Sequence, residues 1–169
     1  QAVKDRCFTL VAGASGSGKS SLVRAGLVPI LQQRMARLRV LTMVPDRDPF
    51  ARLEAALLAV GFDLSDAVLA KTESEETLTN VCQTLRLPDE SWILFIDQFE
   101  EIFTLCTDLN RQREFLTGLS RLIDSGPVAV KVVAAMRSDF FDRFDPYPDL
   151  LDRTQRAGIG DAGFAQAHQ

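Results

Sequence analysis

The chain has 169 residues, of which 46% are hydrophobic and 25% charged, and this composition is typical of one soluble globular domain with a sizeable core. Its net charge of −4 argues against broad binding to nucleic acid or to anionic membranes. No apolar run is long enough to span a membrane, no signal peptide is visible, and Cys7, Cys82 and Cys106 lie in apolar segments, so we expect a cytoplasmic protein with buried thiols. Because the first strand is predicted only six residues after Gln1, we expect the chain to be a fragment of a longer protein.

The first third of the chain predicts two strands, each followed by a helix. The apolar run 7–12 is typical of a buried strand, and after a glycine-rich loop the apolar residues of 19–28 follow helical spacing. Pro29 has no backbone N–H to donate, so this helix is expected to kink or end there. A second strand is predicted at 39–44, and the next helix begins at the cap Asp48-Pro49.

The middle of the chain predicts a further helix and a buried strand. Residues 63–71 are expected to form a short helix or an irregular connection. Thr72-Glu73-Ser74-Glu75 fits a capping box for an amphipathic helix that reaches Leu85. The run Trp92–Ile96 has no polar alternation, which is typical of a strand covered by helices on both faces.

Helices are then predicted at 99–105 and around 115–123, followed by a strand at 128–136 and a short helix after it. Strands that alternate with helices predict right-handed βαβ units and an α/β fold with a mostly parallel sheet. We expect the strand order 2-3-4-1, numbered along the chain, within a core of residues 1–152. Residues 153–169 show little periodicity and are expected to form a weakly ordered tail.

The loop after the first strand carries a phosphate-binding motif. It fits G-x-x-x-x-G-K-[ST], the P-loop, and the flanking strand and helix are the context that this motif requires. Glycines let the backbone N–H groups curl inward, and the helix N-terminus adds donors and a partial positive charge. The lysine provides charge for the β- and γ-phosphates and the serine hydroxyl a ligand for Mg²⁺, whereas a turn that only caps a helix needs neither. The expected nucleotide-binding residues are Gly13, Ala14, Ser15, Gly16, Ser17, Gly18, Lys19, Ser20 and Ser21.

The third predicted strand ends in a second motif. Its apolar residues run into Asp97, the pattern of a Walker B strand, so Asp97 is expected beside the P-loop as a Mg²⁺ site residue together with Ser20. The structural alternative for Asp97 is a helix N-cap. Glu100 and Glu101 follow, and one of them is expected to orient and polarise the attacking water, with Glu101 slightly preferred. Their structural alternative is a favourable place in the first turn of a helix.

Arg137 ends the fourth predicted strand. In the order 2-3-4-1 this strand lies between the strand of Asp97 and the strand before the P-loop, so Arg137 is expected to face the γ-phosphate. An arginine there can sense the phosphate or stabilise charge in the transition state. The alternative is a surface salt bridge, for example with Asp139.

Three segments together resemble a known family. Residues 13–29, Phe-Ile-Asp-Gln-Phe-Glu-Glu-Ile-Phe at 95–103 and Met-Arg-Ser-Asp-Phe-Phe at 136–141 are similar to bacterial STAND NTPases. The nearest group is the novel STAND type often found upstream of WD40 repeats, and the likeness runs from about residue 7 to 151. It implies an ATP-driven regulatory switch in signalling or defence that rests in an ADP-bound or closed state and self-associates when ATP binds. ATP/ADP and Mg²⁺ would be the cofactors, and N-terminal effector or C-terminal repeat domains the partners. The implied roles are Walker A for Lys19 and Ser20, Walker B for Asp97, the acidic pair for Glu100 and Glu101, and the sensor for Arg137.

Two departures from this family lead to an expectation of weak function. Family members have a segment before the first strand that helps to hold adenine, and only six residues precede Cys7 here. They also continue into a fifth strand and a helical lid, which cannot be aligned from Arg153 onward. Whether the fifth strand exists is left open by the sequence, and without it the P-loop strand would be an exposed edge. We expect weak, poorly base-selective nucleotide binding and slow or absent turnover.

Other functions remain open. A non-hydrolysing, nucleotide-gated interaction module would use the same loop. A small-molecule or nucleotide kinase would need an acceptor site and usually an Arg-rich lid, for which no segment is visible. A GTPase is disfavoured because no Asn-Lys-x-Asp string occurs, and an ABC ATPase because no Leu-Ser-Gly-Gly string occurs.

Overall fold

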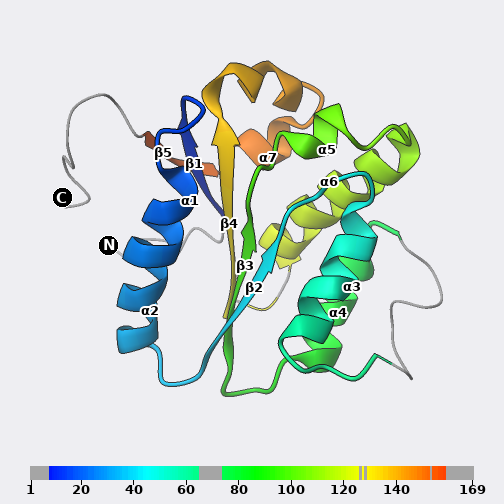
Figure 1. Cartoon of the computed structure of the whole chain (residues 1–169). Coiled ribbons are helices and arrows are strands. Elements are labelled where there is room, and N and C mark those ends of the chain that lie inside the picture. The colour runs from blue at the N-terminus through cyan, green and yellow to red at the C-terminus, as the bar shows by residue number, and fades with distance from the viewer. Residues whose placement is uncertain (1–7, 65–73, 126, 128, 153, 159–169) are drawn as a thin grey trace.

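The computed structural model is built on one sheet of parallel strands in the order β2-β3-β4-β1-β5 (Figure 1). The structure describes residues 8–64, 74–125, 127, 129–152 and 154–158. The four predicted strands and their order 2-3-4-1 are confirmed. The strands are β1 Phe8–Gly13, β2 Leu38–Met43, β3 Ser91–Ile96, β4 Val130–Arg137 and β5 Thr154–Gly158.

Helices cover both faces of the sheet. The helix that follows the P-loop lies on one face, and α3, α4 and α6 lie on the other (Figure 1). Among the described residues, no helix combines the length and hydropathy that a membrane span requires. The helices are α1 Lys19–Ser21, the π-helix η1 Leu22–Leu27, α2 Val28–Arg34, α3 Pro49–Ala59, α4 Thr77–Leu85, α5 Glu101–Thr104, α6 Leu109–Ser125, the 3-10 helix η2 Ser138–Phe144 and α7 Pro148–Asp152.

The sheet separates two hydrophobic clusters. On the face of the first helix, Val23 packs with alternate residues of the central strands, among them Val11 and Phe95. The larger cluster lies under α3, α4 and α6 and includes Trp92 and Phe115. β1, β3 and β4 are apolar on both faces, so core packing fixes their positions. Their carboxyl ends lie together at one end of the sheet, where the polar loops begin.

The helix after the P-loop does not end at Pro29. Lys19 to Arg34 is helical throughout, with Pro29 in the first turn of α2. The preceding η1 has π-helical hydrogen bonds, in which the N–H of Val28 reaches the carbonyl of Val23. A proline removes one donor from the α-helical ladder, and a change to the wider pattern just before it allows the helix to continue.

Two side chains, Ser74 and Thr77, bond to backbone N–H groups at the start of α4. The N–H of Ser74 donates to Thr77 Oγ1 over 2.8 Å, and the N–H of Glu76 donates to Ser74 Oγ over 3.3 Å. Ser74 and Thr77 thus accept backbone N–H groups at the start of α4, although Ser74 Oγ bonds to Glu76 and not to Thr77 as a reciprocal capping box would require. Thr72, Glu73 and the predicted connection at 65–71 lie outside the described residues.

The structure contains a fifth strand, which the sequence left open. β5 pairs with β1 in parallel, from Phe8 opposite Thr154 to Ala12 opposite Gly158. β1 therefore has a neighbour on each side and is not the edge of the sheet. The predicted tail accordingly begins with a strand, and residues 159–169 lie outside the described residues.

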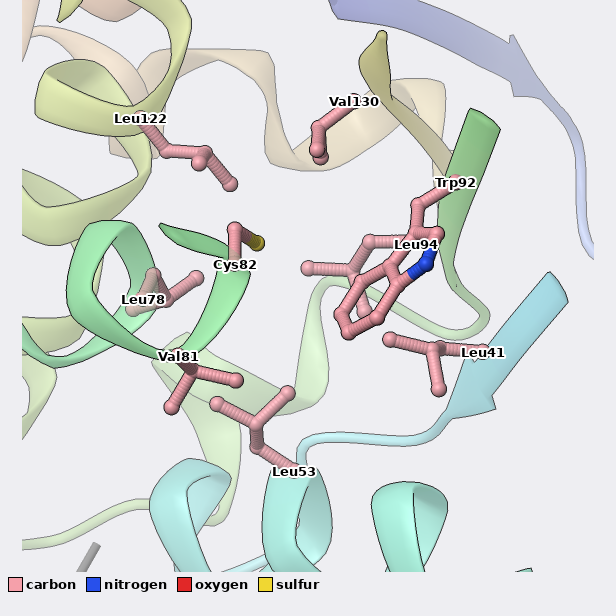
Figure 2. A pocket seen from close by; sticks show the side chains of 9 residues that line it. All are labelled: Leu41, Leu53, Leu78, Val81, Cys82, Trp92, Leu94, Leu122 and Val130. Atoms are coloured by element: carbon pink, nitrogen blue, oxygen red, sulfur yellow. The ribbon is translucent and has the colours of Figure 1, made fainter. Parts of the chain in front are cut away.

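A small cavity lies within the larger cluster (Figure 2). Its volume of about 10 Å³ leaves room for one water at most, and its apolar lining offers such a water no partner. Cys82 borders it, and burial raises the pKa of this thiol to about 12. Cys82 and Cys106 are both buried and free, as expected, while Cys7 lies outside the described residues. The residues around the cavity, all labelled in Figure 2, are Leu41, Leu53, Leu78, Val81, Cys82, Trp92, Leu94, Leu122 and Val130.

Candidate functional site

An open pocket of about 390 Å³ lies at the carboxyl ends of the central strands. It is lined by the P-loop, the start of the following helix, the turn after β3 and the end of β4. These segments meet because parallel strands bring their carboxyl ends to the same edge of the sheet. The lining residues are Ser15, Gly16, Gly18, Lys19, Ser20, Ser21, Asp97, Gln98, Glu100, Ala135 and Arg137.

The P-loop backbone depends on two of its glycines. Gly16 and Gly18 have φ angles of +75° and +83°, which side chains with a Cβ rarely adopt. A turn that contains Gly16 is closed by the N–H of Ser17, which donates to the carbonyl of Ala14 over 3.2 Å. Gly13 ends β1 and is paired in register with Arg137 of β4. The loop therefore curls over the sheet edge and delivers the chain into the helix at Lys19.

Lys19 lies across the mouth of the loop. Its Nζ donates to the carbonyl oxygens of Gly13 and Ala14 over 3.2 Å and 2.7 Å, and to Ser17 Oγ over 3.4 Å. All three acceptors are neutral groups of the loop itself. A phosphate oxygen carries more charge than any of them, so a bound phosphate would compete favourably for the ammonium group.

The Asp97 carboxylate connects β3 to the helix after the P-loop. Its side chain is only 7% exposed, and it accepts from Ser20 Oγ over 2.6 Å, from the N–H of Gln98 over 2.9 Å and from Arg24 Nη2 over 3.3 Å. The Ser20 hydroxyl uses its single hydrogen on Asp97, which leaves its lone pairs available for a cation.

These two oxygen groups suit Mg²⁺. It prefers hard oxygen ligands, few of them from protein, with phosphates and waters for the rest. Among the described residues no group of three His, Cys, Asp or Glu side chains gathers to hold a metal without such help. Ser20 and Asp97 therefore fit a cation that arrives with a phosphate-bearing ligand.

The two glutamates after β3 occupy different surroundings. Glu100 lines the pocket, and its Oε2 is buried with no hydrogen-bond partner among the described residues. Glu101 is not part of the lining. Burial raises the pKa of its carboxyl, and the neighbouring carboxylates of Asp46 and Glu100 add to this rise against the opposing N–H of Asp46. Of the pair, Glu100 is therefore the one that lines the pocket.

Arg137 lines the pocket and also forms the salt bridge considered as its alternative. Its Nε and Nη2 donate to the two carboxylate oxygens of Asp139 over 3.1 Å and 2.7 Å. The guanidinium lies 5.4 Å from the centre of the Phe140 ring. Arg137 can line the pocket and bond to Asp139 at the same time, because β4 ends at the pocket rim and Asp139 follows two residues later.

Two residues of the site were not predicted. Arg24 bonds to Asp97, and its distance of four residues from Ser20 in a helix was a usable signal, since it puts both side chains on one face. Gln98 lines the pocket with a φ of +49°, a conformation uncommon for a residue with a side chain. No pattern in the sequence marks that turn.

Solved structures share this fold at low sequence identity. Cdc6p from Pyrobaculum aerophilum superposes with a TM-score of 0.58 at 17% identity, over 88% of this chain and 38% of that one. Hsp104 of S. cerevisiae in its casein complex gives 0.56 at 14%, over 95% and 24%. The ORC2 protein of Aeropyrum pernix, in ADPNP–ADP complexes, gives 0.56 at 7%, over 90% and 42%. The chain thus spans less than half the length of each of these proteins.

No curated protein matches the chain. A family match is found, however, and it covers nearly the whole sequence: residues 1–160 match the family described as Novel STAND NTPase 1. This extent agrees with the P-loop, the Asp97 strand and the sheet order described above. The chain belongs to the Novel STAND NTPase 1 family and is a STAND-type P-loop NTPase domain.

Proposed function

We propose that this domain binds ATP with Mg²⁺ and hydrolyses it slowly, as the switch module of a larger signalling or defence protein. The observation that carries the proposal is the meeting of Lys19, Asp97, Glu100 and Arg137 around one pocket. We name ATP as the nucleotide because the similar ORC2 structure was obtained with ADPNP and ADP, although we expect this chain to discriminate little between bases.

Each residue has a stated task in this proposal. The N–H groups of the loop and Lys19 bind the phosphates, and Ser20 and Asp97 hold Mg²⁺, which supplies positive charge to the β- and γ-phosphates. Glu100 accepts a hydrogen bond from a water and takes its proton as that water attacks the γ-phosphorus. The bond from the γ-phosphorus to the bridging oxygen breaks, which yields ADP and inorganic phosphate. Arg137 neutralises charge on the transferred group.

The test compares the two glutamates, since they are adjacent and carry the same charge. We expect Glu100→Gln to keep ATP binding and to lower hydrolysis by about 10²- to 10⁴-fold, the usual contribution of a general base. Glu101→Gln is the matched control and is expected to keep most of the hydrolysis. Lys19→Ala is expected to abolish binding. Binding without any turnover in the unchanged protein would instead favour the non-hydrolysing interaction module.

Base selectivity is a separate part of the proposal. Among the described residues, the pocket lining contains no aromatic or large apolar side chain that could hold a base, and this supports the expectation of weak, unselective binding. We expect a Kd for ATP weaker than about 1 μM and a similar value for GTP. Calorimetry with both nucleotides measures this, and a tighter or strongly ATP-selective site would contradict it.

We also propose that ATP binding promotes self-association in a cytoplasmic parent protein with effector or repeat domains. The family membership supports this proposal. Sedimentation of the chain with ADP and with a non-hydrolysable ATP analogue tests it. An equal mass in both states would contradict it.

A further inference from the structure

The end of β4 presents one arginine to two competing acceptors. Arg137 lines the phosphate pocket, yet its guanidinium is bonded through two nitrogens to the carboxylate of Asp139. We propose that Asp139 holds Arg137 back from the γ-phosphate and so sets how strongly the site prefers ATP over ADP. This inference rests on the proposed function, because it needs a nucleotide in the pocket.

The backbone makes this partnership local. Arg137 is the last residue of β4, and Asp139 lies in the first turn of η2, two residues later. Phe140 comes next, packs against the larger core cluster and offers its ring to the guanidinium at 5.4 Å. Arg137 is thus held at the pocket rim by a carboxylate and an aromatic face, both from the turn that follows its own strand.

The pair is weak enough for a phosphate to replace it. The side chains of Arg137 and Asp139 are 43% and 58% exposed, so water screens their attraction. Exposed pairs of this kind change an equilibrium by no more than about fivefold. A γ-phosphate brings more negative charge and can also accept two guanidinium N–H groups.

Lys19 and Arg137 would respond to different phosphates. Lys19 is bonded to carbonyls of the P-loop, so it meets any phosphate that the loop binds, including that of ADP. Arg137 is in register with Gly13 at the start of the loop but comes from the neighbouring strand. In the proposed function only the γ-phosphate reaches Arg137. The need to break the bond between Arg137 and Asp139 therefore weakens the binding of ATP and leaves the binding of ADP unaffected.

The experiment measures Kd for ATP and ADP, both with Mg²⁺, by calorimetry on the whole chain. Asp139→Asn keeps the size of the side chain but removes its charge, and we expect ATP to bind about two- to fivefold more tightly with the Kd for ADP unchanged. Asp142→Asn is the matched control, because Asp142 is exposed in the same helix and carries the same charge. We expect it to leave both constants unchanged. Both residues are exposed, so the variants should keep the melting temperature of the unchanged chain.

A double-mutant cycle shows whether the effect runs through Arg137. In an Arg137→Ala background, Asp139→Asn should no longer tighten ATP binding. Persistence of the gain in that background would overturn the proposal, as would equal gains for ATP and ADP or the same gain from Asp142→Asn. An unchanged Kd for ATP in Asp139→Asn would overturn it too. If the unchanged chain binds no nucleotide, the proposed function itself fails, which is a different result from a site that binds ATP without responding to Asp139.

Discussion

At the scale of single residues, Arg24 forms a salt bridge with Asp97. Asp97 is nearly buried, and Arg24 is its charged partner in the structure, at 3.3 Å. We predict that Arg24→Ala lowers the stability of the nucleotide-free protein by about 1 kcal/mol, a low value because the guanidinium is 58% exposed. Melting curves without ligand should show a decrease of about 2–4 °C.

The same variant should recover when Mg²⁺ and nucleotide are added, because a metal ion beside Ser20 and Asp97 brings positive charge to that carboxylate. Arg34→Ala is the control, since Arg34 is exposed about 15 Å further along the same helix. A deficit in melting temperature that is equal with and without Mg²⁺ and nucleotide would contradict the prediction.

Glu90 directly precedes β3, at the end of the sheet away from the pocket, and forms an ion pair with Arg39 in which the glutamate is buried. Its side chain is 5% exposed, and it accepts from Arg39 Nη2 over 2.8 Å and from Trp92 Nε1 over 3.1 Å. These bonds, led by Arg39, lower the pKa of Glu90 from 4.5 to about 2. We predict that Glu90→Gln costs about 1–3 kcal/mol near neutral pH, because the charge-assisted bond to Arg39 is lost.

The pH dependence of this cost follows from the direction of the shift. The carboxyl is more acidic in the folded state, so its contribution is complete above about pH 4.5 and is lost as the pH falls toward 2. The difference in free energy of unfolding between Glu90→Gln and the unchanged protein should therefore shrink between pH 6 and pH 3. Urea unfolding at several pH values measures it, and a constant difference would be inconsistent with the lowered pKa.

At the scale of the elements, α4 and α6 approach each other closely at Gly118. A Cβ at this buried position would lie 2.9 Å from Leu78 Cδ1 and 3.2 Å from the carbonyl oxygen of Glu75. The leucine can move, but the backbone carbonyl cannot do so easily. We predict that Gly118→Ala lowers stability by about 1 kcal/mol, although alanine favours a helix over glycine by a similar amount.

Gly26 offers a comparison for Gly118 in another helix. A Cβ there would meet only Leu22 Cδ1, at an ordinary 3.5 Å. Gly26→Ala is expected to keep or raise the melting temperature. If both alanine variants were equally stable, the close approach of α4 to α6 would not limit the residue at position 118.

Much of the fold could be predicted because its elements carry their own signals. The apolar strands, the P-loop and the Asp97 motif each have a pattern that needs no tertiary information. β5 has no such pattern: Thr-Gln-Arg-Ala-Gly contains one β-branched residue and no apolar run. What makes it a strand is the free edge of β1, which the sequence of 154–158 does not encode.

The motifs named most of the residues that line the pocket, but not which of the two glutamates is among them. Lys19, Ser20, Asp97 and Arg137 all lie where the motifs placed them, at the edge that parallel strands share. The choice between Glu100 and Glu101 depends on how the chain turns after β3. That turn contains Gln98 with a positive φ, so no helical phase counted from the sequence could show which of the two glutamates lines the pocket.

At the scale of the whole molecule, β5 makes β1 a central strand. Five consecutive residues of β1, Phe8–Ala12, pair with β5 on one side, while β4 pairs on the other. The P-loop begins at the end of β1, so the position of the phosphate site relative to Arg137 depends on a strand that β5 protects. An unprotected β1 would present a row of unpaired backbone groups.

We predict that truncation after Asp152 lowers the free energy of unfolding by at least about 2 kcal/mol, since several backbone hydrogen bonds are lost together. The truncated chain should also associate, because the apolar β1 becomes an open edge that another copy can pair with. Thermal unfolding and light scattering measure the two effects, and a truncation after Gly160 that retains β5 is the matched control. Equal stability and equal mass for the two truncated chains would mean that β5 contributes nothing to the sheet. Weaker nucleotide binding only in the shorter chain would show that the phosphate loop relies on the fifth strand.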